Sequence, residues 1–246
     1  RLGPAARGAL TWIEKCGDLA GDSYLEYRTR SPKGLVNQYW KDSGNSVLFA
    51  YGRIAEPPIA TSEVQGYAYD ARVRAARLAR LVWRDDGLAA RLEAEAADLR
   101  RRFNADFWNQ ERGHYVLALD ASKRQVDAMT SNAGHLLWSG IVDEERASAT
   151  VERLMAPDMF SGWGIRTMST NDAGYNPIEY HNGTVWPHDT GLIAEGFRRY
   201  GFREQASHLA LALIDASAYF DHRRSAVLHR FARSAPRLRG DSPPAS

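Results

Sequence analysis

The order of helical segments and loops constrains this chain more than any other feature. Apolar residues recur at helical intervals over residues 5–15, 61–83, 88–107, 131–138, 144–155, 190–200 and 203–217. Plain turns at 85–87 and 142–143 alternate with long polar and aromatic loops at 34–46, 56–66 and 161–189. A ring of helical hairpins has this pattern, with simple turns at one end and functional loops at the other. The sequence therefore predicts an all-α chain of antiparallel helix pairs.

One short β excursion interrupts this pattern. Residues 114–119 are expected to form a strand, and residues 126–129 complete a small hairpin with it. The chain has 246 residues and is 44% hydrophobic, which is enough for a substantial core.

Composition excludes several classes of partner. The net charge of +2 gives no general case for nucleic acid, and no apolar run reaches the roughly 18 residues that a membrane span needs. The single cysteine, Cys16, cannot form an internal disulfide, which is compatible with a reducing, cytoplasmic location. Oligomeric state is left open.

The densest polar stretch is Tyr180-His-Asn-Gly-Thr-Val-Trp-Pro-His-Asp189. Pro187 and Gly183 interrupt regular structure, so the polar groups are expected at the entrance of the next helix. Hydroxyl-rich ligands need hydrogen-bond partners and an aromatic platform, so His181, Asn182, Trp186 and His188 are candidate sugar contacts. The alternative is a locally capped helix with Trp186 in the core.

A second cluster lies in residues 34–46. Asp42 follows Trp40 and Lys41, and a carboxyl group held against an indole can have its pKa raised by desolvation, as a general acid requires. Lys41 would oppose that shift if its ammonium pointed at the carboxylate. The alternative is that Asp42 acts as an N-cap before residues 47–51.

Two further polar residues, Glu63 and Gln65, fall in the first turn of the 61–83 helix. They are either ligand contacts at the helix mouth or, for Glu63, a charge that favours the helix dipole. The acidic segment 17–27 does not match the twelve-residue calcium loop, so no metal and no cofactor are expected there or elsewhere.

Four motifs in order carry a family resemblance. They are Asn37-Gln-Tyr-Trp-Lys-Asp-Ser43, Glu63-Val-Gln-Gly-Tyr67, Gly162-Trp-Gly-Ile-Arg-Thr167 and the 180–189 stretch. Together they resemble the catalytic domain of bacterial amylo-alpha-1,6-glucosidase-type glycogen debranching proteins, which are six-hairpin glycosidases. The resemblance covers about residues 5–220. It implies an (α/α)6 toroid, of which this chain holds only part.

The resemblance also implies a reaction and a set of roles. The reaction is inverting hydrolysis of an α-glucosidic bond in an α-glucan or oligosaccharide, for which one carboxyl group protonates the leaving group while another activates water. Asp42 falls where the general acid would sit. The implied substrate contacts are Trp40, Lys41, Glu63, Gln65, Trp163, Arg166, His181, Asn182, Trp186 and His188.

The C-terminal segment departs from the family pattern. Residues 221–246 are rich in Arg, Pro and Ser and contain six arginines, which is typical of a disordered tail after a 1–220 domain. The segment that would supply the family's general base is missing, so we interpret the tail as the product of a frameshift near residue 222; the alternative is a genuine basic tail. Glu179 is the candidate substitute base, although a solvent-facing Glu is the plainer reading.

The sequence leaves three functional hypotheses open. The first is a glycosidase domain acting on α-glucans. The second is a carbohydrate-binding remnant without turnover, and the third is a helical interaction scaffold whose incomplete ring exposes an apolar edge.

Overall fold

The structure is a computed structural model, and it describes residues 2–220. The predicted 221–246 tail and the proposed frameshift lie outside these residues. The helices of the described part are α1 Gly3–Cys16, α2 Ser62–Leu78, α3 Asp86–Asp106, α4 Asn132–Ser139, α5 Glu144–Met155, α6 Pro187–Arg199 and α7 Arg203–Phe220. The mostly helical fold expected from the apolar periodicity is confirmed.

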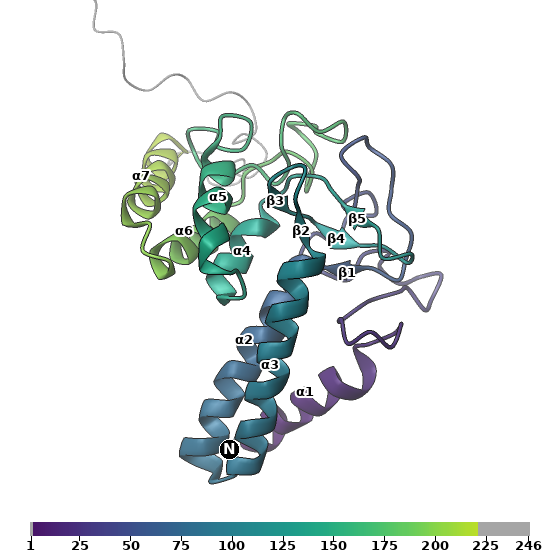
Figure 1. Ribbon diagram of the computed structural model, residues 1–246. Helices are drawn as coiled ribbons and strands as arrows, with labels where there is room; N and C mark the ends of the chain where they lie inside the picture. Colours follow the sequence, from purple (N-terminus) through teal and green to yellow (C-terminus); the bar gives the residue numbers. More distant parts are fainter. Residues whose placement is uncertain (1, 221–246) are drawn as a thin grey trace, which may run out of the picture.

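Helices α2 and α3 form a long hairpin that projects from the rest of the molecule, with α1 against it (Figure 1). Helix α2 continues as a π-helical turn over Ala79–Trp83 and ends where Arg84 takes a left-handed conformation with φ of 54°. Asp85 then caps α3 by accepting a hydrogen bond from the backbone N–H of Leu88 at 3.0 Å. The polar 85–87 stretch is thus the plain turn that the sequence predicts.

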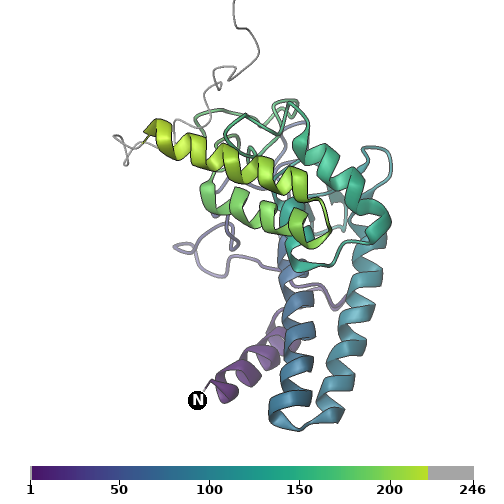
Figure 2. The same ribbon diagram turned by 90° about the vertical axis from the view of Figure 1, so that its left-hand side faces the viewer.

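The other helices stack beside the upper end of this hairpin, and α6 and α7 lie antiparallel next to each other (Figure 2). Helix α4 packs against α2 and α6. Gly134 lets α4 and α6 approach closely, because a Cβ at this position would lie 2.3 Å from Cγ1 of Ile193. This close approach packs the start of α4 against the middle of α6, and the next residue, His135, reaches Asp189 in the first turn of α6.

The strands form two small sheets between the helices and the long loops. They are β1 Ala60–Thr61, β2 Trp108–Asn109, β3 His114–Tyr115, β4 Ala118–Leu119 and β5 Gln125–Val126. The first sheet has the antiparallel order β1-β4-β5, and β2 pairs with β3 in the second. The β excursion is confirmed, but the predicted 114–119 strand divides between two sheets.

The main core lies where α2, α3, α4 and α6 meet the sheets, and it includes Phe103, Phe107, Leu136, Ile193 and Phe197. Helix α6 begins at Pro187 rather than near residue 190, so the end of the 180–189 stretch is helical. Residues 47–51 contain no helix, and the interpretation of Asp42 as an N-cap is therefore wrong.

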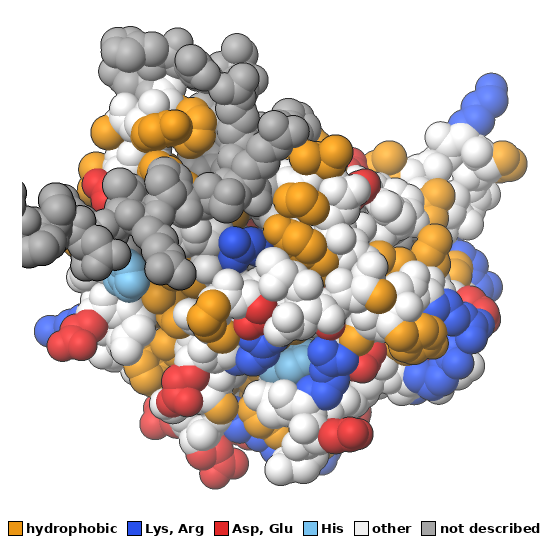
Figure 3. All heavy atoms as spheres, turned by 90° about the horizontal axis from the view of Figure 1, so that it is seen from above, with side chains coloured by type: hydrophobic (Ala, Val, Ile, Leu, Met, Phe, Trp, Pro, Cys, Tyr) orange, Lys and Arg blue, Asp and Glu red, His pale blue; other side chains and the backbone are white. Residues whose placement is uncertain are grey.

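The loop end of the molecule mixes positive, negative and apolar side chains (Figure 3). This mixture agrees with the nearly balanced net charge. Within residues 2–220, no helix is both long enough and apolar enough to cross a bilayer.

Candidate functional site

An aromatic cluster forms where the 34–46 loop meets the start of α6. The indole of Trp40 is at its centre, with ring centroids 5.6 Å from His181, 6.1 Å from Trp186 and 5.3 Å from His188, all in edge-on geometry. These spacings are those of favourable aromatic contacts. The structure thus brings together four residues that were predicted from two separate motifs.

The rings of the 180–189 stretch are held by their own backbone. Trp186 donates its indole N–H to the carbonyl of Tyr180 at 3.0 Å and to the hydroxyl of Thr184 at 3.1 Å, and it stacks on His181 with centroids 5.5 Å apart. His188 is exposed at the first turn of α6. The cluster therefore has a fixed inner part and an accessible edge.

Asp42 lies beside this cluster and is open to solvent. Its side chain is 51% exposed, and Oδ1 is 4.0 Å from Nδ1 of His181. His181 is buried, and its Nδ1 is 2.9 Å from the hydroxyl of Ser43. Burial, followed by the nearby Lys41, lowers the pKa of His181 to about 4, so the ring is neutral near pH 7. Asp42 thus lies at the solvent-exposed edge of the aromatic cluster, next to a neutral imidazole, and is not buried against the indole of Trp40.

A layer of buried charged groups lies beneath Trp40. Lys41 is 1% exposed, and its ammonium donates to the carbonyl of Thr167 at 2.7 Å. Burial lowers its pKa to about 8, against the opposing effect of Asp189 and Glu63. The same ammonium lies over the ring of Trp40, 5.0 Å from its centroid, so Lys41 is placed behind the aromatic cluster, and its role as a substrate contact stays a prediction.

The two carboxylates of this layer, Glu63 and Asp189, have pKa values shifted in opposite directions. Burial raises the pKa of Glu63, and the Asn132 amide and the His135 imidazole offset only part of that rise. Burial also disfavours the charge of Asp189, but the hydrogen bond from His135 and the charges of His135 and Lys41 hold its pKa below the usual range. Both side chains are fully buried. Glu63 thus lies in the first turn of α2 as predicted, but its side chain is enclosed rather than open to solvent.

Several buried polar atoms of this region lack hydrogen-bond partners in residues 2–220. They are Nε1 of Trp40 and the hydroxyls of Thr61 and Ser62, whereas the carboxylates of Glu63 and Asp189 interact with the Asn132 amide and the Ser131 hydroxyl. Leaving a buried donor or acceptor unpaired costs about 1–3 kcal/mol. A group of such atoms in one region is typical of a site that receives polar molecules.

Three other predicted contacts lie outside the aromatic cluster. Gln65 is buried and bonds the backbone N–H and carbonyl of Leu25 at 2.9 and 2.8 Å, so it fastens the 17–27 segment to α2. Trp163 is buried in a small core with Val185 and Phe220. Arg166 is half-buried and donates to the carbonyl of Pro157 at 3.3 Å.

Glu179 and Asn182 both contact the loop that carries Asp42. Asn45 donates its amide to Glu179 at 3.2 Å, and Asn182 donates to the carbonyl of Asn45 at 2.9 Å. Glu179 is only half-buried. The predicted substitute base thus lies on the same side of the molecule as the predicted acid.

Sequence reasoning missed His135. Its ring stacks on Trp40 with centroids 5.9 Å apart and 18° between the planes, and its Nε2 is 2.6 Å from Oδ1 of Asp189. It is 1% exposed. Its only signal was a histidine among the small and apolar residues of the 131–138 helix, which does not show what it will meet.

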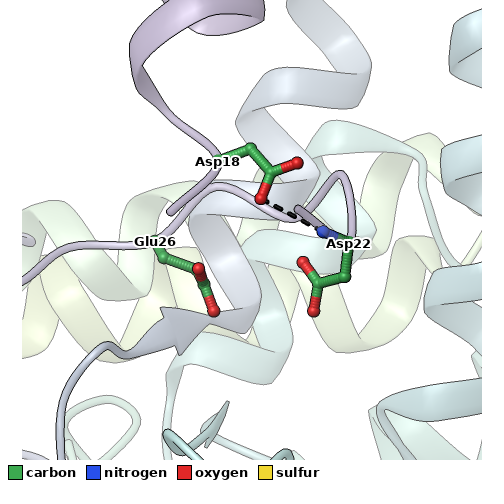
Figure 4. A group of neighbouring side chains, drawn as sticks. All are labelled: Asp18, Asp22 and Glu26. Carbon is green, nitrogen blue, oxygen red and sulfur yellow. Dashed lines mark hydrogen bonds between the residues drawn. The ribbon is translucent and has the colours of Figure 1, made fainter. Parts of the chain in front are cut away.

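A separate acidic group, Asp18, Asp22 and Glu26, lies in the 17–27 segment (Figure 4). Asp18 accepts from the backbone N–H groups of Gly21, Asp22 and Ser23. The ammonium of Lys123 forms ion pairs with Asp22, at 2.5 Å, and with Glu26. These contacts close the segment and account for the carboxylates as a structural unit.

The fold is that of the helical-hairpin glycosidases. A mannosylglycerate hydrolase of Thermus thermophilus, solved in complex with glucose, superposes with a TM-score of 0.59 at 21% identity, over 65% of this chain and 40% of that one. The neutral trehalase of Saccharomyces cerevisiae gives a TM-score of 0.62 at 18% identity, over 73% of this chain and 36% of that one.

The family follows from the sequence match. Residues 24–226 match the family described as Mannosylglycerate hydrolase MGH1-like glycoside hydrolase domain, and the chain belongs to it. A mannosylglycerate hydrolase of Rubrobacter radiotolerans is 27% identical over 126 residues, which is 50% of this chain. A cytosolic neutral trehalase of Neurospora crassa is 24% identical over 194 residues, or 69% of this chain. The chain spans 28% and 26% of the lengths of these two relatives.

This family corrects one expectation from sequence. The predicted six-hairpin glycosidase type is confirmed, but the matching family is of the mannosylglycerate hydrolase type and not specifically the amylo-alpha-1,6-glucosidase type.

Proposed function

We propose that this domain binds and hydrolyses a small glycoside at the Trp40 cluster. The observation that carries the proposal is the exposed carboxylate of Asp42 beside a set of aromatic rings gathered from two distant loops. Aromatic faces cover the apolar side of a sugar ring, and a carboxyl group beside them is placed to protonate a glycosidic oxygen.

In this proposal Asp42 is the general acid, and His188, Trp186 and Trp40 form the sugar platform. Inverting hydrolysis needs a second carboxylate roughly 6.5–9.5 Å from the first, and retaining hydrolysis needs one about 5–5.5 Å away. Glu179 is the candidate for this second group, because its carboxylate accepts a hydrogen bond from the loop that carries Asp42.

The substrate class is proposed from the relatives. Mannosylglycerate hydrolases and trehalases appear among the similar proteins, and one Thermus thermophilus structure contains D-glycerate. We therefore place mannosylglycerate and trehalose ahead of maltotriose and of a branched α-glucan.

The test is hydrolysis of these four substrates by the purified chain. Asp42→Asn is expected to reduce turnover of the accepted substrate by at least about 100-fold, as loss of a general acid does. Asp86→Asn is the matched control, because Asp86 is 87% exposed at the far end of the α2–α3 hairpin and should change nothing. Equal turnover in the wild type and Asp42→Asn would exclude Asp42 as the acid.

Sugar binding without turnover is the second candidate function. It is favoured by the burial of Glu63 and Asp189, since enclosed carboxylates cannot activate a water at the surface. Calorimetric titration with the same sugars separates hydrolysis from binding alone. Binding without hydrolysis supports a carbohydrate-binding remnant, and absence of both binding and hydrolysis leaves the helical interaction scaffold.

A further inference from the structure

Trp40 has support on one face that the proposed sugar platform does not use. The imidazole of His135 lies nearly parallel to the indole, at 5.9 Å between centroids and 18° between planes. The other three aromatic neighbours in residues 2–220, His181, Trp186 and His188, meet the indole edge-on at 79° to 88°, and the Lys41 ammonium lies 5.0 Å from the ring centroid. His135 is therefore the ring on which Trp40 lies flat.

His135 is fixed at both ring nitrogens. Its Nε2 is 2.6 Å from Oδ1 of Asp189, and its Nδ1 forms a hydrogen bond with the hydroxyl of Tyr67. His135 and Asp189 are 1% and 0% exposed. Two hydrogen bonds in opposite directions define the ring plane, because an imidazole held at both nitrogens cannot rotate without losing one of them.

The three members come from three helices. Tyr67 is on α2, His135 on α4 and Asp189 on the first turn of α6. These helices are packed together in the core. The packing of these helices therefore fixes the orientation of the His135 ring. Trp40 lies in a loop, and its stacking on His135 makes the indole orientation depend on the same packing.

The indole N–H of Trp40 shows why its orientation matters. Trp186 donates its N–H to Tyr180 and Thr184, whereas Nε1 of Trp40 has no hydrogen-bond partner within residues 2–220. This indole donor is buried, and an unpaired buried donor costs about 1–3 kcal/mol, so the ring keeps this orientation only if other contacts hold it.

We propose that Tyr67, His135 and Asp189 form a positioning unit that sets the plane of Trp40 and thereby its affinity for a sugar. The unit acts through Trp40 and does not touch the ligand. The inference about affinity rests on the proposed sugar-binding function, whereas the inference about the ring plane does not.

The experiment measures both parts in the full chain. The indole 1H–15N resonance of Trp40, assigned with Trp40→Phe, and quenching of its fluorescence by acrylamide report the ring without any ligand. Titration with trehalose and mannosylglycerate reports affinity. His135→Phe retains an aromatic ring but loses both hydrogen bonds, and Asp189→Asn keeps the shape but loses the charge.

Both variants are expected to shift or broaden the Trp40 indole resonance and to weaken sugar binding about tenfold, the size of an aromatic contact energy. His208→Gln is the matched control, because His208 is exposed on α7 and its ring lies 4.9 Å from that of Phe160, away from Trp40. It should leave both readouts unchanged.

An unchanged Trp40 resonance in folded His135→Phe and Asp189→Asn would overturn the positioning unit. If these two variants fail to fold, Tyr67→Phe decides, since it removes one hydroxyl and leaves the ring; a Trp40 resonance identical to the wild type would then refute the proposal. Absence of sugar binding by the wild type with an altered resonance in the variants would refute the proposed function alone.

Discussion

Two buried histidines link the stability of this chain to pH. Burial is the main cause that lowers the pKa values of His114 and His181 from 6.5 to about 4. Between pH 6.5 and 4 the unfolded chain therefore binds more protons than the folded chain, and the free energy of unfolding decreases as the pH falls through this window.

We expect the urea midpoint to decrease on acidification from pH 6.5 to 4, and His114→Gln to make this dependence shallower. Urea titrations at pH 7, 5.5 and 4 measure it. The control is His208→Gln, whose exposed side chain should keep the wild-type slope. A slope that is identical in His114→Gln would show that His114 does not contribute.

At the scale of the elements, the contact between α4 and α6 decides how the site is built. Gly134→Ala would place a methyl group 2.3 Å from Cγ1 of Ile193, and overpacking of this kind costs about 1–3 kcal/mol. Because α4 carries His135 and α6 carries Asp189, the same change should also weaken sugar binding.

Gly191→Ala is the matched control on α6. No atom of residues 2–220 lies within 4 Å of a Cβ at Gly191, so alanine should stabilise the helix by about 0.5–1 kcal/mol. Chemical denaturation of both variants gives the comparison. Equal stabilisation by the two alanines would mean that α4 and α6 are not held as closely as the structure has them.

At the scale of the whole molecule, Arg112 joins segments that are far apart in sequence. Its guanidinium is 3.0 Å from Asp127 and 3.0 Å from Asp172. Those carboxylates accept in turn from the backbone N–H groups of Ala50 and Met129. One side chain thus ties the β excursion to the 161–189 loop and, through Asp127, to the segment that follows the 34–46 loop.

Arg112→Met should destabilise the chain by about 3 kcal/mol, because it leaves the buried Asp172 without its countercharge. It should also speed proteolysis within the loops. Arg101→Met provides the comparison: its side chain is 71% exposed and paired with Asp98, and surface pairs contribute about 0–1 kcal/mol. Equal unfolding free energies for the two variants would contradict a stabilising role of the Arg112 ion pairs.

The sequence alone determined the helices, because apolar periodicity is a local property. Residues 61–83 are helical from Ser62 onward once the π-helical turn is included, and α5 begins at Glu144 and ends at Met155 as predicted. It also determined which loops meet: Ser43 contacts His181, and Lys41 contacts Thr167. The loop composition and the family resemblance together carried that prediction.

Only the tertiary structure decided which side chains face the site. Gln65 and Trp163 have the right residue types for sugar contacts, yet they bond backbone or fill a small core. His135 meets Asp189 across 54 positions of sequence, a contact that requires α4 and α6 to touch at Gly134. Local pattern fixes the period of a helix, whereas the direction of each side chain depends on packing between elements that are distant in sequence.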